Sequence, residues 1–195
     1  MLGGDFRVVA LVASAGGLDA LGRVLSMLPG DFPAAVIALQ HTQPTRGSEL
    51  AELLGRQCRM PVRTPADGLA LVPGAVFAAP PGQHILVSPD RTVALIRSGD
   101  FPPHRPSADL LFVSMALSLG GKAIGVVLSG LSHDGAAGVA ALVRFGGTVF
   151  ASDEATSTEF SMPRAALRAT GGLGLPLDDI AAALVEATHA VTQRP

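Results

Sequence analysis

Apolar residues along the chain fall into two alternating patterns. In the first, short runs rich in Val, Ile and Ala continue without an interior charge, which is typical of strands buried on both faces of a parallel sheet. We predict such strands at Arg7 to Ala13, Ala34 to Gln40, Ala123 to Ser129 and Thr148 to Ala151.

In the second pattern, apolar residues recur at helical spacing, which predicts amphipathic helices between and after the strands. The predicted faces are Leu18, Leu21, Leu25 and Leu28; Leu50, Leu53 and Leu54; Leu110, Leu111, Met115 and Leu119; and Ile180, Leu184, Ala187 and Val191. Ser107 is suited to cap the third of these helices, and Asp178 with Asp179 opens the last.

The middle of the chain differs, because its apolar runs are short and separated by turn residues. Pro80-Pro81-Gly82 and Pro89-Asp90 divide runs at Val76 to Ala79, His84 to Ser88 and Thr92 to Ile96, a pattern typical of antiparallel strands or hairpins. The sequence therefore predicts an α/β fold: a doubly wound, mostly parallel sheet flanked by helices, with a β-hairpin excursion near residues 62–97. We expect one domain over residues 1–195.

Composition narrows the class of protein. Hydrophobic residues make up 48% of the chain and charged residues 15%, enough apolar material for a sizeable core. The formal net charge of −2 and the absence of charge blocks give no reason to expect nucleic acid or an anionic membrane as a partner. No apolar run reaches the roughly 18 residues of a membrane span, and the single cysteine, Cys58, cannot form an internal disulfide. We therefore expect a cytoplasmic protein without membrane insertion, and an incidental role for Cys58.

Three polar residues follow three of the predicted strands. Ser14 follows the first strand, His41 the second and Asp134 the third. In a doubly wound sheet, catalytic groups collect outside the carboxyl ends of the strands. A serine needs a base to become a nucleophile, a histidine supplies one near neutral pH, and a carboxylate orients the imidazole. The positions predict a hydrolase triad.

Two other interpretations of the Ser14 segment compete with this one. Serine is a good helix cap and Gly16-Gly17 a good turn, so the junction could be purely structural. A phosphate could also approach the helix start at Gly16, but the segment lacks G-x-G-x-x-G and a P-loop lysine. The five histidines show no paired ligand spacing, so we predict no metal site and no cofactor.

Five separated motifs together carry a resemblance to a known family. They are ASAGG at 13–17, QH at 40–41, HRPSADLLFVSMA at 104–116, GVVLSGLSHDGAAG at 125–138 and DEATSTEFSMPRAA at 153–166. Their order and content resemble the catalytic domain of the CheB-type chemotaxis receptor protein-glutamate methylesterases. The resemblance extends from Phe6 to about Leu177.

The resemblance implies a serine hydrolase that removes methyl groups, as methanol, from glutamyl methyl esters on the cytoplasmic helical bundle of methyl-accepting chemoreceptors. Many members also deamidate receptor glutamines. It places the nucleophile at Ser14, the general base at His41 and the orienting carboxylate at Asp134. It implies the receptor bundle as partner, with a separate regulatory protein as a second candidate.

Around this triad the sequence predicts further site residues and shows departures from the family. Backbone N–H groups in the Gly130-Leu131 turn are the expected oxyanion donors, and the small residues Ala15 and Gly16 leave room for the substrate carbonyl. Ala15 stands where the family usually has threonine, and Leu131 where methionine is usual. His133, beside Asp134, replaces a residue that is usually small or polar, so it could crowd or tune the site.

Family members usually carry an N-terminal receiver domain, whereas here the first strand begins near Met1. We therefore expect no receiver domain and an activity that phosphodonors leave unchanged. Two alternatives to a chemoreceptor methylesterase remain: a decayed or repurposed homologue that acts as a protein-binding module, and an esterase for a non-chemotaxis substrate. The motifs His104 to Ser107 and Met162 to Arg164 have no chemistry that the residues alone assign.

Overall fold

The computed structural model describes residues 6–41, 49–98 and 104–189. Its main sheet has six strands in the order β3-β4-β2-β1-β7-β8, and every neighbouring pair is parallel. A separate antiparallel pair is formed by β5 and β6. The strands are β1 (Arg7–Ala13), β2 (Ala34–Gln40), β3 (Val62–Arg63), β4 (Ala75–Ala78), β5 (His84–Val87), β6 (Val93–Ile96), β7 (Ala123–Val127) and β8 (Thr148–Ala151).

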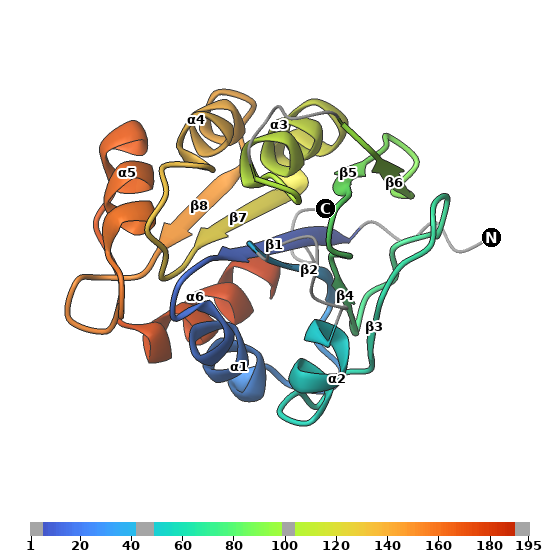
Figure 1. Cartoon of the computed structure of the whole chain (residues 1–195), viewed down its shortest axis with the longest axis horizontal. Helices are drawn as coiled ribbons and strands as arrows, with labels where there is room; N and C mark the ends of the chain where they lie inside the picture. The colour runs from blue at the N-terminus through green and yellow to red at the C-terminus, as the bar shows by residue number, and fades with distance from the viewer. Residues whose placement is uncertain (1–5, 42–48, 99–103, 190–195) are drawn as a thin grey trace.

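Helices cover both faces of the sheet (Figure 1). They are α1 (Gly17–Met27), α2 (Leu50–Gly55), α3 (Ala108–Leu119), the 3-10 turn η1 (Gly120–Lys122), α4 (Ala136–Arg144), α5 (Ser161–Thr170) and α6 (Leu177–His189). In Figure 1, α3 and α4 lie above the sheet, α5 lies to its left, and α1, α2 and α6 lie below it.

The alternation of β1 explains why two cores form. Successive side chains of a strand point to opposite faces, so Val8, Ala10 and Val12 join the core with α3, α4 and α5. Val9, Leu11 and Ala13 join the core with α1, α2 and α6. Both sets are fully buried, which is why the run contains no polar position.

The strand order places a topological switch point beside β1. From β1 the chain moves to β2 on one side, and it later returns to β7 on the other side. The carboxyl ends of these three strands lie next to one another, which is where ligands bind in doubly wound sheets. Ser14, His41 and the loop after β7 all start from this edge.

Most of the predicted elements are confirmed, and the doubly wound, mostly parallel α/β fold is as expected. β1, β2 and β8 have the predicted bounds, whereas β7 ends two residues earlier, at Val127. The β-hairpin excursion is narrower than predicted. β5 and β6 are the antiparallel pair, but β4, which contains Val76, is a parallel strand of the main sheet and pairs with β3.

Two helices, α4 and α5, have no counterpart among the predicted elements. Among the described residues, no helix is long and apolar enough to cross a membrane.

Candidate active site

Ser14 lies on the tight turn between β1 and α1. Its N–H donates to the Ser129 carbonyl at 2.9 Å, which ties the turn to the end of β7. Two residues later in the same turn, Gly16 has φ +70°. A Cβ at Gly16 would lie only 2.6 Å from the Thr158 side chain. Gly16 is also the N-cap of α1, and no side chain caps this helix. Ser14 is therefore not a helix cap, whereas Gly16 does form the turn that the structural interpretation expected.

His41 lies beside Ser14 because of the register between β1 and β2. Ala13 pairs with Gln40, and the His41 N–H donates to the Ala13 carbonyl at 2.9 Å. The imidazole Nε2 lies 2.8 Å from Asp134 Oδ2, and both side chains are 7% exposed. The ring stacks on His104 with a centroid distance of 4.4 Å and an interplanar angle of 9°. The ring plane is therefore held by two contacts.

The second ring nitrogen of His41, Nδ1, differs from Nε2 in its surroundings. Nδ1 is buried and has no hydrogen-bond partner among the residues that the structure describes. With Asp134 accepting from Nε2–H, the neutral ring keeps its lone pair on Nδ1. Nδ1 is therefore the atom of this ring that can accept a proton from a neighbouring hydroxyl.

Asp134 is held by the N-terminus of α3. Its carboxylate accepts hydrogen bonds from the Ser107 hydroxyl at 3.0 Å, the Ala108 N–H at 2.7 Å and the Asp109 N–H at 3.0 Å, besides the one from His41. Burial alone would raise the pKa of Asp134, but the hydrogen bonds from His41 and the two backbone N–H groups outweigh it and lower this pKa to about 2. Asp134 is ionised throughout the neutral range.

Asp109, in the first turn of α3, binds the N-terminus of α4 in the same way that Asp134 binds the N-terminus of α3. Its Oδ1 accepts from the Gly135 N–H at 2.9 Å and the Gly138 N–H at 2.7 Å, at the start of α4. Each helix thus has its free N–H groups satisfied by a carboxylate from the other segment. Burial raises the pKa of Asp109, and its hydrogen bonds from Gly138 and Gly135 counter this only in part. The pair fixes the loop that carries Asp134 against α3.

A buried histidine, His84, accepts a hydrogen bond from the backbone of Ser107. His84 is fully buried; its Nδ1 accepts from the Ser107 N–H at 3.2 Å, and its Nε2 lies 2.8 Å from the Ser98 hydroxyl. Burial, followed by repulsion from Arg105, lowers the pKa of His84, which favours the neutral ring that these contacts require. The hairpin β5-β6 therefore reaches the site through His84.

The loop after β7 packs closely against Ser14. The Ser14 Cβ and the Met162 sulfur lie where a Cβ at Gly130 would stand, so a side chain would not fit there. Gly130 is one of the expected oxyanion donors, but in this structure its N–H donates to the Glu159 carbonyl at 2.9 Å. The N–H groups of Ala15 and Leu131 make no hydrogen bond among the described residues.

The remaining predicted site residues lie at different depths. Leu131 is 58% exposed and His133 is exposed, both on the outer side of the loop that carries Asp134. His133 does not enter the His41–Asp134 pair. Cys58 lies away from this edge of the sheet, after α2, and burial raises the pKa of its thiol, which disfavours the thiolate.

Several residues of the site were missed by sequence reasoning. His104 stacks on His41, and Ser107 and Asp109 act on the Asp134 loop. Ser129 joins two turns, since its hydroxyl donates to the Ala15 carbonyl at 2.7 Å and accepts from the Glu159 N–H at 2.9 Å. The motif HRPSADLLFVSMA at 104–116 contains His104, Ser107 and Asp109 and was the available signal for them, although the residue types alone did not say what they contact. In the part of the chain that the structure describes, no three His, Cys, Asp or Glu side chains are grouped to hold a metal ion.

The chain is similar to known proteins over most of its length. The CheB methylesterase family model matches residues 9–184. The chain is 40% identical, over 98% of its length, to protein-glutamate methylesterase/protein-glutamine glutaminase 3 of Burkholderia orbicola, and 44% identical, over 83%, to a protein of the same kind, numbered 5, from Anaeromyxobacter dehalogenans. It spans 56% and 45% of these relatives, about half their length.

A solved structure shows the same architecture. The CheB methylesterase catalytic domain of Thermotoga maritima superposes with a TM-score of 0.88 at 29% identity, covering 94% of this chain and 99% of that one. The family match, the curated relatives and the shared fold agree with one another. The chain belongs to the CheB methylesterase family.

Proposed function

We propose that this chain is a serine hydrolase that demethylates glutamyl methyl esters on the cytoplasmic helical bundle of methyl-accepting chemoreceptors, in the cytoplasm. The observation that carries the proposal is the 2.8 Å contact between His41 and Asp134 beside Ser14, in a chain of this family. Relatives that share 40% of the sequence are named protein-glutamate methylesterases.

In the proposed first step, the Ser14 hydroxyl attacks the ester carbonyl carbon. The O–H bond breaks, and its proton passes to His41 Nδ1, the lone-pair nitrogen opposite the Asp134 contact. Asp134 stabilises the imidazolium that forms and does not itself take the proton. A tetrahedral intermediate results, with negative charge on the former carbonyl oxygen.

The intermediate then collapses, and the bond to the methoxy group breaks. The leaving oxygen takes the proton from Nδ1 and departs as methanol, which leaves the glutamyl group bound to Ser14 as an ester. A water molecule, deprotonated by Nδ1, hydrolyses this ester by the same sequence. The products are glutamate and free Ser14.

Backbone N–H groups near Ser14 are the proposed oxyanion donors. The Ala15 N–H follows the nucleophile directly, as in other hydrolases with a nucleophile on a strand-to-helix turn, and the Leu131 N–H lies on the adjoining loop. Both are free of hydrogen bonds to described residues, whereas the Gly130 N–H is engaged. The proposal therefore keeps the Leu131 N–H from the expected Gly130-Leu131 turn and takes the Ala15 N–H in place of that of Gly130.

The experiment is methanol release from a methylated cytoplasmic chemoreceptor fragment, with nitrophenyl acetate as a small-ester comparison. We expect methanol release by the wild type and none by Ser14→Ala, which removes one oxygen from a turn held by its backbone. A folded wild type that hydrolyses nitrophenyl acetate but not the receptor ester would favour a non-chemotaxis esterase. Inactivity on both esters would favour a binding module.

Deamidation of receptor glutamines is a second proposed activity of the same site. The names of the relatives include protein-glutamine glutaminase. The chemistry differs in the leaving group, because His41 would protonate ammonia instead of methanol. Ammonia release from an unmethylated, glutamine-bearing receptor fragment, lost in Ser14→Ala, is the corresponding test.

A further inference from the structure

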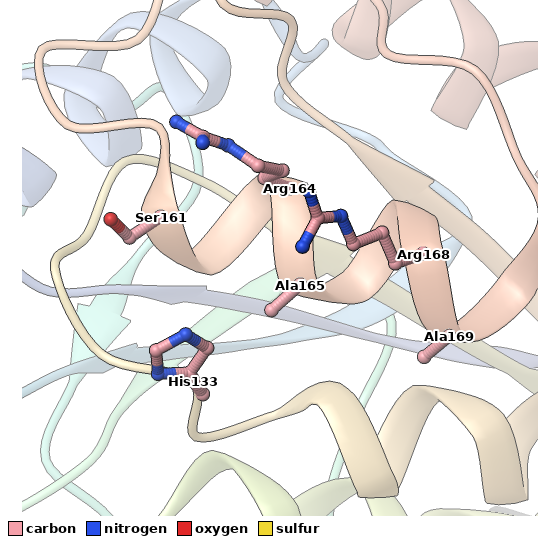
Figure 2. Close-up of a pocket in the computed structure, with 6 residues that line it drawn as sticks. All are labelled: His133, Ser161, Arg164, Ala165, Arg168 and Ala169. Carbon is pink, nitrogen blue, oxygen red and sulfur yellow. The ribbon is translucent and has the colours of Figure 1, made fainter.

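A basic hollow of about 450 Å³ opens beside the site, between α5 and the loop that carries Asp134. We call it the α5 hollow. Figure 2 shows His133 on the loop facing helix α5, and the two arginines on the same side of that helix. Its lining residues are His133, Ser161, Arg164, Ala165, Arg168 and Ala169.

The α5 hollow carries positive charge, and none of the residues that line it is acidic. Arg164 and Arg168 are both exposed and lie four residues apart, so their side chains share one helix face. Neither forms an ion pair with a described residue. Arg164 lies over the Phe160 ring at 5.3 Å, which orients its guanidinium. The acidic residue nearest in sequence, Glu159, pairs with neither arginine.

Two segments of the chain border both the hollow and the candidate active site: the start of α5 and the loop that carries Asp134. The Met162 N–H donates to the Gly130 carbonyl at 2.9 Å, and Gly130 lies against Ser14. Met162 follows Ser161 of the hollow directly in the chain. In the loop after β7, His133 of the hollow directly precedes Asp134. A polypeptide that presents an ester to Ser14 is therefore close enough to reach the hollow with a neighbouring side chain.

Two guanidinium groups on one face are suited to a carboxylate, because each offers a planar pair of N–H donors. The net charge of the whole chain, −2, makes a general polyanion site a poor alternative. We infer that the α5 hollow binds an acidic side chain of the substrate polypeptide, near the glutamyl ester that Ser14 attacks. The inference rests on the proposed function and names a specificity determinant for it.

The test compares the double variant Arg164→Gln/Arg168→Gln with a control of equal charge change, Arg56→Gln/Arg59→Gln, located at the end of α2. Glutamine is a good helix former, so both variants are expected to fold. The readout is the ratio of kcat/KM for the methylated receptor fragment to kcat/KM for nitrophenyl acetate, at low and at high salt.

Exposed charge pairs act mainly on encounter and specificity and are screened by salt. We expect the ratio to fall roughly tenfold in the α5 variant at low salt, through KM, and to approach that of the wild type at high salt. The control is expected to change it less than about twofold. An unchanged ratio in the α5 variant, or an equal fall in both variants, overturns the inference while the proposed function stands. A wild type that releases no methanol overturns both.

Discussion

At the scale of single residues, the site depends on which imidazole nitrogen contacts the carboxylate. In the best known serine hydrolases the carboxylate binds Nδ1 and the serine faces Nε2. In this chain Asp134 binds Nε2, so Nδ1 is left for the proton transfer. In the proposed mechanism, the three residue types therefore act with the ring reversed relative to those hydrolases. His41 follows β2 and Asp134 lies on the loop after β7, on opposite sides of Ser14.

Replacement of Asp134 by asparagine tests this orientation. The amide can donate to Nε2, which would move the imidazole proton to Nδ1 and remove the base. We expect folded protein whose methanol release falls by orders of magnitude, up to the roughly ten-thousandfold of wrong-tautomer triads. Near-normal activity in Asp134→Asn would assign the orienting role to another group.

We expect His104 to act as a positioning residue, because its ring stacks on the His41 ring. Stacked rings contribute about 0.5–1.5 kcal/mol, so His104→Ala is expected to lower kcat about twofold to tenfold. His104→Phe retains a flat ring and should restore most of the loss. Burial, followed by repulsion from His41, lowers the pKa of His104, so the neutral ring of the stack is the form that phenylalanine imitates. If Phe and Ala are equally impaired, the stack is not what matters.

Sequence indicates the position of a side chain best where the end of a strand determines it. Ser14 and His41 directly follow β1 and β2, and Asp134 lies on the loop after β7, so the strand order brings all three to one edge of the sheet. His104, Ser107 and Asp109 act through contacts with residues far along the chain, such as that between Ser107 and Asp134. No local pattern encodes such a pairing.

At the scale of elements, α3 and α4 hold each other through their N-termini. Asp109 satisfies two N–H groups at the start of α4, and Asp134 satisfies two at the start of α3. Without these two carboxylates, the first N–H groups of α3 and α4 would lack hydrogen-bond acceptors.

Asp109→Ala is expected to destabilise the protein by about 1–2 kcal/mol, because the N–H groups of Gly135 and Gly138 lose their acceptor. Asp109→Asn keeps an acceptor oxygen and should cost less. The measurement is urea unfolding of both variants and the wild type. Equal stability of all three would mean that water replaces the cap at no cost.

Element prediction succeeded for strands and failed where short segments are ambiguous. The Val76 run is four residues long and bounded by turn residues, so a buried parallel strand and a hairpin strand look alike there. β4 is buried at every position, which is typical of a strand in a parallel sheet. α4 is rich in small residues and begins in a glycine-rich loop, which hides its helical period.

At the scale of the whole molecule, the depressed pKa of Asp134 links the site to acid stability. The pKa falls on folding from 3.8 to about 2, so the ionised carboxylate favours the folded state. That contribution, about 2 kcal/mol, is complete above pH 3.8 and is lost as the pH falls through about 2.

The pKa of Asp109 is raised, so this residue makes the free energy of unfolding change with pH in the opposite direction. The effect of Asp134 is therefore measured as the difference between the wild type and a variant. The free energy of unfolding of the wild type minus that of Asp134→Asn is expected to shrink between pH 4 and pH 2 by about 2 kcal/mol. A difference that stays constant over this range would mean that folding does not lower the pKa of Asp134.

The central claim is that Ser14 is a nucleophile activated by His41, and site-resolved labelling with a fluorophosphonate tests it most directly. Mass spectrometry of digested protein locates the adduct, and the labelling rate is compared between wild type and His41→Ala. We predict one adduct, on the peptide that contains Ser14, with labelling slowed by orders of magnitude in His41→Ala. An adduct elsewhere, no adduct, or equal labelling of Ser14 in both proteins would contradict these roles of Ser14 and His41.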